Sequence, residues 1–370
     1  MPQLPTRQRT SLEHLIVSVL LLATTGALMA RQVTPSAAIP VDAITGILGA
    51  FKTNSLVAIS DAHGNKQAQD FLISLVRDRR FAETVNDVVV EWGSARYQDV
   101  IDRFVNGENI PYESLRRVWR DTTQASAGGD LPDKEEFFRA VRAVNAPLPP
   151  ARRLRVLLGD PPIVWENVRS KEDHRKWIEM REWFPAALIE TEVLAKQRRA
   201  LITYGHGHYQ RRNVEANYES YGRLTDSLVS LLEAATGTKV FIVWRDAGLA
   251  DIQPNIAKWP TPSFATVRGT VLGAADFARY TGMANDRRSI RDGKVVPVPR
   301  NEWRQLAAEE QFEAVLYLGP PSSIVASTWT RELCADDAYM KMRMERMALA
   351  GLPPSEANAL KTQCAELLRR

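Results

Sequence analysis

The stretch LVAISDAHGN, residues 56–65, contains the signals that decide the fold. Its first half, LVAIS, is a continuous apolar run without polar alternation, which is typical of a strand buried on both faces of a sheet. Asp61, His63 and the turn residues Gly64 and Asn65 follow at once. We therefore expect a buried strand that ends in a polar turn.

Further runs along the chain share this pattern of a short apolar strand followed by a turn with Gly or Pro. They are 87–90 (DVVV), 154–158 (LRVLL), 200–203 (ALIT), 239–244 (KVFIVW) and 314–318 (AVLYL). Strands that alternate with helical segments form a parallel sheet covered by helices. The predicted fold class is α/β, with a mostly parallel central sheet flanked by helices. Segments 96–145 and 168–199 exceed a minimal crossover, so we expect helical insertions there.

Composition and charge exclude several classes of protein. The chain has 370 residues, of which 45% are hydrophobic and 25% charged, with a formal net charge of +4. These proportions are those of a globular protein and exclude a disordered or disulfide-dense chain. The small net charge gives no electrostatic footprint for nucleic acid.

The amino terminus has the pattern of a targeting segment. Residues 15–29, LIVSVLLLATTGALM, carry no charge and follow Arg7 and Arg9. Such a run extends about 22 Å as a helix, short of the roughly 30 Å hydrocarbon core of a membrane. We expect residues 1–38 to be a signal peptide cleaved after Ala30 or Ala38, with an uncleaved anchor as the alternative. The protein is then expected to be periplasmic or secreted, without a permanent membrane span if the signal is cleaved.

Cys334 and Cys364 are the only cysteines, and an oxidising compartment favours their pairing. Residues 39–330 are expected to form the α/β domain, and residues 331–370 a C-terminal hairpin with helices at about 336–349 and 355–369. In a straight hairpin the two cysteines are offset by roughly 10 Å. A disulfide therefore requires the chain near Cys334 to bend back. Two separately buried thiols are the alternative.

Polar residues follow almost every predicted strand. They are Asp61 and His63 after the first, Glu91 after the second, Asp160 after the third, Tyr204, His206, His208 and Tyr209 after the fourth, and Arg245 and Asp246 after the fifth. The carboxyl ends of parallel strands line one edge of an open sheet, where ligands bind. We therefore expect these side chains to face one crevice.

Three of the five histidines lie in these turns, and imidazole is suited to proton transfer near neutral pH. We predict His63 as a general base, with Glu91 and Asp61 as its orienting acids and His208 as an electrophile. His206, Asp160, Tyr209 and Arg245 are candidate metal or substrate ligands. The alternative is structural, with the acids capping helices and Arg245 pairing with Asp246 at the surface. His174, in the charged segment KEDHRKW, is expected on a solvated helix outside the site.

The order of these motifs resembles the superfamily of erythromycin esterases, Tiki-type proteases and ChaN-like haem-binding uptake proteins. The resemblance covers residues from about 50 to 320. It rests on the turn with Asp61 and His63, the strand that ends in Glu91, and the Gly-x-Gly-His turn that ends in His208. Compared with the superfamily pattern, Ser60 replaces a glycine and Asp61 replaces a glutamate.

The resemblance implies an exported hydrolase of ester or amide bonds, acting on a small-molecule or peptide substrate. It implies as an alternative a haem- or metal-binding uptake protein without catalysis, in which Tyr204 and Tyr209 ligate iron. In a metal-assisted hydrolase, the His and carboxylate groups bind Zn or Mn.

A second resemblance is to calcineurin-type metallophosphoesterases, which hold two metals. It rests on ISDAHGN (59–65), LGD (158–160) and GHGH (205–208). The Gly-Asn-His-Asp/Glu turn of those enzymes has no counterpart here, because His174 is the only histidine between 64 and 205.

Overall fold

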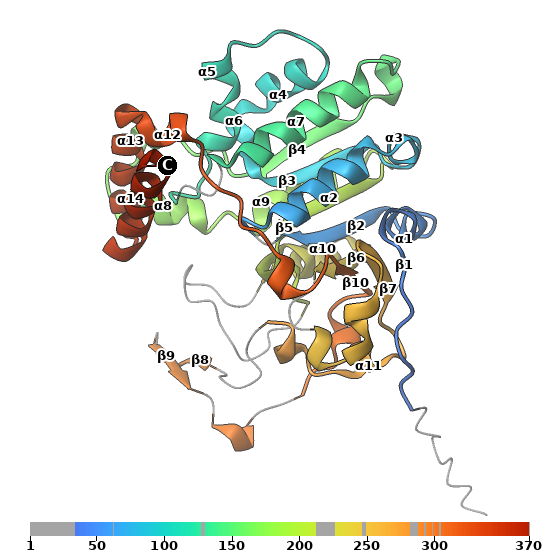
Figure 1. The fold of residues 1–370 in the computed structure, drawn as a ribbon. Coiled ribbons are helices and arrows are strands. Elements are labelled where there is room, and N and C mark those ends of the chain that lie inside the picture. The colour runs from blue at the N-terminus through green and yellow to red at the C-terminus, as the bar shows by residue number, and fades with distance from the viewer. Residues whose placement is uncertain are drawn as a thin grey trace, which may run out of the picture. The chain divides into compact units, whose positions relative to one another are not determined.

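An eight-stranded sheet lies at the centre of the fold (Figure 1). The computed structural model describes residues 34–61, 63–126, 130–211, 226–245, 249–281, 288–291, 294–297, 299–302 and 305–369. The strands of the sheet are β1 (Val41–Asp42), β2 (Leu56–Asp61), β3 (Asp87–Ser94), β4 (Arg155–Asp160), β5 (Ala200–Gly205), β6 (Phe241–Arg245), β7 (Ser263–Thr266) and β10 (Ala314–Tyr317). A separate two-stranded sheet pairs β8 (Arg288–Arg291) with β9 (Lys294–Pro297).

The strand order is β1-β7-β10-β6-β2-β5-β3-β4. All neighbours from β10 to β4 pair in parallel, whereas β7 is antiparallel to β10 and β1 is antiparallel to β7. The expected mostly parallel sheet is confirmed, and each of the six apolar runs forms one of its parallel strands. The short strands β1 and β7 and the β8–β9 pair were not predicted.

Helices connect the strands and fill the two predicted insertions. They are α1 (Ala43–Ala50), α2 (Lys66–Arg77), α3 (Arg79–Thr84), α4 (Gln98–Val105), α5 (Tyr112–Leu115), α6 (Arg117–Arg120), α7 (Pro132–Asn145), α8 (Lys171–Ile178), α9 (Trp183–Ile189), α10 (Leu228–Thr236), α11 (Val271–Ala274), α12 (Arg331–Ala335), α13 (Asp337–Leu349) and α14 (Pro354–Arg369). A π-helical turn, Glu190–Leu194, continues α9, and a 3₁₀ turn, His206–Tyr209, follows β5.

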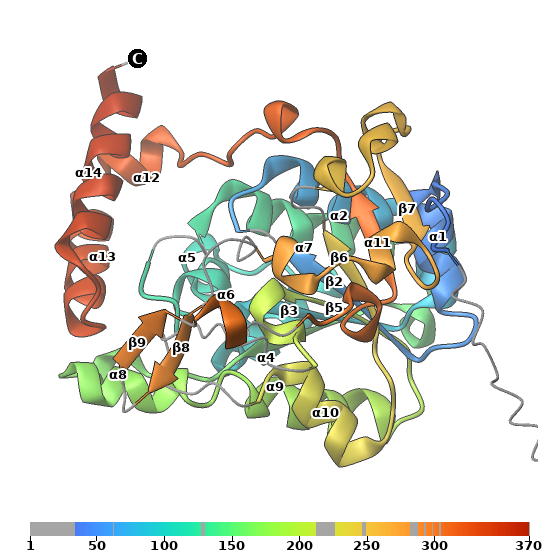
Figure 2. The same ribbon diagram turned by 90° about the horizontal axis from the view of Figure 1, so that it is seen from below.

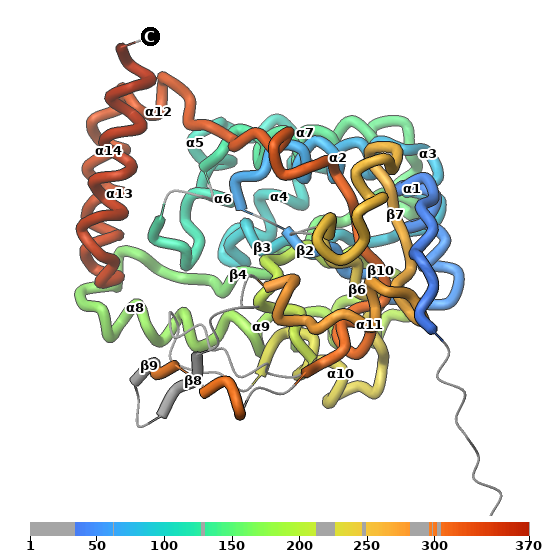
Figure 3. Tube along the Cα trace, turned by 60° about the horizontal axis from the view of Figure 1, so that its bottom comes forward, coloured from blue at the N-terminus to red at the C-terminus, as the bar shows by residue number. Residues whose placement is uncertain are grey.

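Helices cover both faces of the sheet. Helices α1, α2 and α7 lie on one face, and α9 and α10 lie on the other (Figures 2 and 3). Alternate side chains of β2 enter the two cores: Val57 and Ile59 pack on the α2 side, and Leu56 and Ala58 on the α10 side. Burial on both faces is the physical reason that these strands read as continuous apolar runs.

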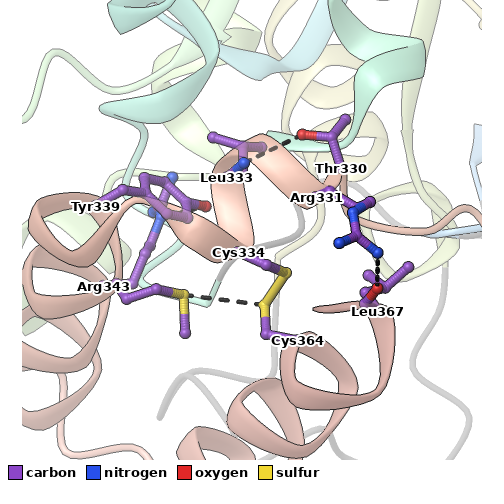
Figure 4. Close-up of a disulfide and its surroundings, with 9 residues drawn as sticks. Thr330, Arg331, Leu333, Cys334, Tyr339, Arg343, Cys364 and Leu367 are labelled. Atoms are coloured by element: carbon purple, nitrogen blue, oxygen red, sulfur yellow. Dashed lines mark hydrogen bonds between the residues drawn. A yellow bond between two sulfur atoms is a disulfide. The ribbon is translucent and has the colours of Figure 1, made fainter. Parts of the chain in front are cut away.

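The C-terminal tail is closed by the disulfide that the sequence predicts. Cys334 in α12 is bonded to Cys364 in α14, with the Cα atoms 5.1 Å apart (Figure 4). The required bend is present, because α12 ends before Asp336, whose side chain caps the separate helix α13. A disulfide that closes a loop of this length contributes on the order of 3 kcal/mol to stability.

The predicted targeting segment lies mostly outside the described residues. Where the description begins, the chain is already attached to the fold, because Ser36 pairs with Thr270 and the backbone N–H of Ala38 donates to Gln253 Oε1 at 2.9 Å. Ala38 is buried. Among the described residues, no helix combines the length and the apolar character needed to cross a membrane.

Candidate functional site

The carboxyl ends of β2, β5 and β3 lie side by side and carry the candidate site. In the parallel register, Asp61 at the end of β2 pairs with Gly205 at the end of β5. On the other side of β5, the pairing with β3 stops at Val90, one residue before Glu91. The strands β2 and β5 are neighbours in the sheet, but the chain leaves β2 towards β3 on one side and leaves β5 towards β6 on the other. Neighbouring strands whose connections run in opposite directions open a ligand site in α/β sheets.

Glu91 is the centre of the site. One carboxylate oxygen, Oε2, accepts the backbone N–H of Gly205 at 2.7 Å, where the β3–β5 ladder has stopped. The other, Oε1, accepts from Gln124 Nε2 at 2.9 Å and from the guanidinium of Arg181. Burial alone would raise the pKa of Glu91, which is 2% exposed, but nearby cations outweigh burial and hold the pKa well below its ordinary value. Glu91 is therefore an ionised carboxylate.

His63 approaches Glu91 from the turn after β2. Its Nε2 lies 3.6 Å from Glu91 Oε2, and its Nδ1 lies 3.3 Å from Asp61 Oδ2. The side chain is 55% exposed. The Glu91 charge, aided by Asp61, raises the pKa of His63 against the opposing effect of burial. A Cβ at Gly205 would lie 3.1 Å from His63 Nε2, so the glycine makes room for the imidazole.

Gly205 is required for space and not for its backbone angles. Its φ is −55°, which any residue adopts, so unusual backbone angles are not the reason for glycine here. Close approach of His63 is the reason.

His208 approaches the same carboxylate from the turn after β5. Its Nε2 lies 3.5 Å from Glu91 Oε1, and its Nδ1 lies 2.9 Å from the Glu182 carboxylate. The side chain is only 11% exposed. Burial lowers the pKa of His208, but Glu182 and Glu91 outweigh burial and raise it to about 9. His208 is therefore an imidazolium at neutral pH, with a carboxylate at each ring nitrogen.

Asp61 is held by residues from two helices. Gln69 in α2 donates to Oδ1 at 2.9 Å, and Lys134 in α7 lies 3.4 Å from Oδ2. The Lys134 ammonium also lies 3.9 Å from the centre of the Trp92 ring, which favours a buried cation. Burial raises the pKa of Asp61, but Lys134 and His63 outweigh it and lower the pKa to about 2. Asp61 does not cap α2, because Asn65 does so.

Asp160 is linked to Glu91 through Arg181, and its carboxylate accepts hydrogen bonds from the loop that contains Thr123. Thr123 donates to it through its backbone N–H and through its hydroxyl, both at 2.6 Å, and Arg181 Nε lies 3.8 Å away. Burial raises the pKa of Asp160 to about 7, against Arg181 and Thr123, which lower it.

The expectation that His174 is solvated is wrong. The imidazole is buried, stacks on Trp165 and contacts the Thr123 carbonyl at 2.8 Å through Nε2. Burial lowers its pKa, so the ring is neutral and structural. The segment around His174 is mostly charged, so its sequence does not reveal that one side of α8 faces the protein interior.

Three other candidates lie nearby in different settings. Tyr209 is fully buried, and its hydroxyl donates to the backbone carbonyls of Ile59 and Ile202. His206 packs edge-on against Trp244, and burial followed by the charge of His63 lowers its pKa. Arg245 lines a cavity of about 10 Å³ together with Asp61 and Gln69. Asp246 lies outside the described residues.

The insertions supply partners of the site that the sequence does not predict. Arg181 and Glu182 precede α9, Gln124 follows α6, and Lys134 is in α7. None of them follows a strand, so the strand-end rule could not find them. The only available signal was composition, because Arg181 and Glu182 adjoin the aromatic pair Trp183-Phe184 in the second insertion.

The donor set does not fit a divalent metal ion. Among the residues that the structure describes, no group of three or more His, Cys, Asp or Glu side chains is arranged to hold one. The carboxylates of Glu91 and Asp160 already face Arg181, and Asp61 faces Lys134. A cation placed among them would meet these positive charges. The two-metal arrangement of the calcineurin-type resemblance does not fit for the same reason.

The tyrosines do not fit an iron-ligating role either. The Tyr209 hydroxyl donates to backbone carbonyls. Tyr204 is 1% exposed and lies in the core on the face of the sheet that α10 covers. Burial raises the pKa of both phenols well above the ordinary value, which disfavours the phenolate that binds iron.

No protein-family model matches the sequence, and no curated protein matches it. Among solved structures, the type III effector HopBA1 aligns over 78% of this chain and 99% of its own, with 12% identity and a TM-score of 0.38. A succinoglycan biosynthesis protein aligns over 78% and 95%, with 8% identity and a TM-score of 0.48. ChaN of Campylobacter jejuni, whose structure concerns cofacial haem binding, aligns over 56% and 87%, with 11% identity and a TM-score of 0.35. These are distant likenesses in the course of the chain, and neither family membership nor activity follows from them.

Proposed function

We propose that this protein is an exported hydrolase of ester or amide bonds that activates water with the Asp61–His63 pair. One observation carries the proposal: two imidazoles face the two oxygens of a single buried carboxylate, and only one of them is open to solvent. Pairs of titratable groups with different surroundings are typical of acid–base sites.

His63 is the group that exchanges protons in this proposal. Its Nδ1 is directed at Asp61, which fixes the tautomer with the proton on Nδ1 when the ring is neutral. Its Nε2 lies 3.6 Å from Glu91, beyond hydrogen-bond distance, on a half-exposed ring. Nε2 takes a proton from water as the water oxygen bonds to the substrate carbonyl carbon, and returns it to the leaving group when the ester or amide bond breaks.

His208 has a different task from the electrophile that the sequence predicts. Both its ring nitrogens are engaged by carboxylates and its side chain is buried, so it offers no donor to a substrate. We assign it the positioning of Glu91, whose negative charge it balances. We assign the stabilisation of the substrate's carbonyl oxygen to His206 and Arg245, at the ends of β5 and β6. Neutral imidazole and guanidinium both donate hydrogen bonds, which such an oxygen accepts.

The test is hydrolysis of p-nitrophenyl acetate, p-nitrophenyl butyrate and a peptide p-nitroanilide. Wild-type turnover of at least one probe is expected, with a loss of roughly 10²-fold or more in His63→Ala. Because the site is half exposed, added imidazole is expected to restore part of the lost rate. Full activity in His63→Ala, or no turnover of any probe, would overturn the proposal.

We further propose export with cleavage of the targeting segment after Ala30. The predicted alternative, after Ala38, would cut beside a buried residue whose own N–H and carbonyl both bond to Gln253. The amino-terminal sequence of protein recovered from the periplasm or medium should begin at Arg31. Recovery of membrane-bound protein that retains Met1 would instead indicate an anchor.

A further inference from the structure

We propose that Ser327 is a positioning residue for His63, an inference that rests on the proposed role of His63 as the proton-transfer group. Ser327 lies in the connection from β10 to α12, which runs past the start of α2 (Figure 1, orange-red). We name residues 323–327 the strap.

The strap pairs with the turn that carries His63. Lys66 donates its backbone N–H to the Val325 carbonyl at 3.0 Å, and Ser327 donates its own N–H to the Gly64 carbonyl at 2.7 Å. Between these bonds, Asn65 and Ala326 form an antiparallel bridge. The strap therefore acts as a short added strand along residues 64–66, directly after His63.

The Ser327 hydroxyl fixes the strap to α7, the helix that carries Lys134. It donates to Asp133 Oδ2 at 2.6 Å, and Asp133 is buried at the start of α7. The next residue, Lys134, contacts Asp61. Ser327 thus joins the two elements that present His63 and Lys134 to the same carboxylate.

This connection matters because His63 has few restraints of its own. Its ring contacts with Asp61 and Glu91 are long, at 3.3 and 3.6 Å, and Gly64 beside it adopts a left-handed φ of +75°. The position of the imidazole therefore depends on where the turn is held. Misplacement of a catalytic group by 1 Å costs up to about 10²-fold in rate.

The strap is also anchored beyond Ser327. Thr330 caps α12, which carries Cys334, and the disulfide ties this helix to α14. These anchors do not depend on the Ser327 hydroxyl, so a Ser327→Ala variant should still fold while the strap loses its bond to α7.

The experiment compares Ser327→Ala with Ser323→Ala in the full chain. Ser323 is a matched control because it lies in the same strap and, within the described part of the chain, its hydroxyl bonds to the Pro320 carbonyl of that connection and not to α7. Two readouts are used: kcat/KM on the most active p-nitrophenyl ester, and the pKa of the His63 ring from NMR titration. A third variant, Ser327→Thr, restores a hydroxyl.

We expect Ser327→Ala to lower kcat by on the order of tenfold with KM nearly unchanged, and Ser327→Thr to recover most of the loss. The pKa of His63 should fall towards its ordinary value as the ring moves from its carboxylates, while that of His208 stays the same. Identical His63 titration in Ser327→Ala, Ser323→Ala and wild type would overturn the inference. The NMR readout needs no turnover, so it tests positioning even if the hydrolase proposal fails.

Discussion

The turn after β2 and the turn after β5 each bring an imidazole to Glu91, yet they build different groups. His63 is half exposed, with one nitrogen directed at Asp61 and the other beyond hydrogen-bond distance of Glu91. His208 is buried and has a carboxylate at each nitrogen. Each ring lies between Glu91 and a second carboxylate. The two rings differ in the burial of His208 and in its shorter contact with Glu182, 2.9 Å against 3.3 Å from His63 to Asp61. We therefore expect His208 to keep its proton and His63 to exchange one.

Removing the charge of Glu91 should have the largest effect on stability, because Glu91 contacts the histidines of both turns. Glu91→Gln leaves Arg181 and His208 buried without their common partner. Breaking a buried ion pair in this way costs about 3–5 kcal/mol. Urea unfolding measures the loss. Glu166→Gln is the matched control, since Glu166 likewise faces more than one basic side chain, Arg96 and Arg117, but is exposed. It should cost less than about 1 kcal/mol. Equal costs would contradict the assigned importance of burial.

Replacing the two histidines one at a time should lower turnover in both variants but lower stability much more in one than in the other. His208→Ala removes a buried cation from between buried Glu91 and half-buried Glu182 and is expected to cost about 3 kcal/mol. His63→Ala removes a half-exposed ring and is expected to cost less than about 1 kcal/mol. Both variants should lose turnover. A larger stability loss for His63→Ala than for His208→Ala would reverse the comparison.

The pH dependence of stability should report His208 more than any other histidine. Its pKa in the folded protein is about 9, above the ordinary value of about 6.5 in the unfolded chain. The folded state therefore binds the proton more tightly, and this stabilisation is complete below about pH 6.5 and is lost as the pH rises through about 9. Urea unfolding from pH 6 to 10 should show a decline in wild type that is reduced in His208→Ala. Equal declines in both proteins would contradict the assignment.

The smallest expected effect comes from a single methyl group beside His63. Gly205→Ala places a Cβ 3.1 Å from His63 Nε2, whereas Gly207→Ala meets nothing within 4 Å. Because Gly205 has an ordinary φ, its replacement should change stability by less than about 1 kcal/mol. We expect a several-fold loss of kcat in Gly205→Ala and wild-type kcat in Gly207→Ala. Equal rates in the two variants would show that the contact does not restrain His63.

The strand-end part of this site follows from the sequence, and the insertion part does not. Asp61, His63, Glu91 and His208 could be placed together because apolar runs identify buried parallel strands, and such strands end at one edge. Glu182, just before α9, and Lys134, in α7, belong to insertions whose packing on the sheet is set by long-range contacts. No local pattern encodes those contacts. The burial of His174 in α8 could not be predicted for the same reason. The strand β1 could not be predicted either, because its two residues are too few to produce an apolar pattern.

Titration of the imidazole nitrogens by NMR most directly tests the claim that His63 exchanges a proton whereas His208 keeps one. Nitrogen shifts of the two rings, assigned with His63→Ala and His208→Ala, report the protonation state and tautomer of each. We expect His208 to stay doubly protonated through pH 8 and to titrate near 9. We expect His63, once neutral, to carry its proton on Nδ1 towards Asp61. A neutral His208 at pH 7, or a neutral His63 with its proton on Nε2, would show that these roles are assigned wrongly.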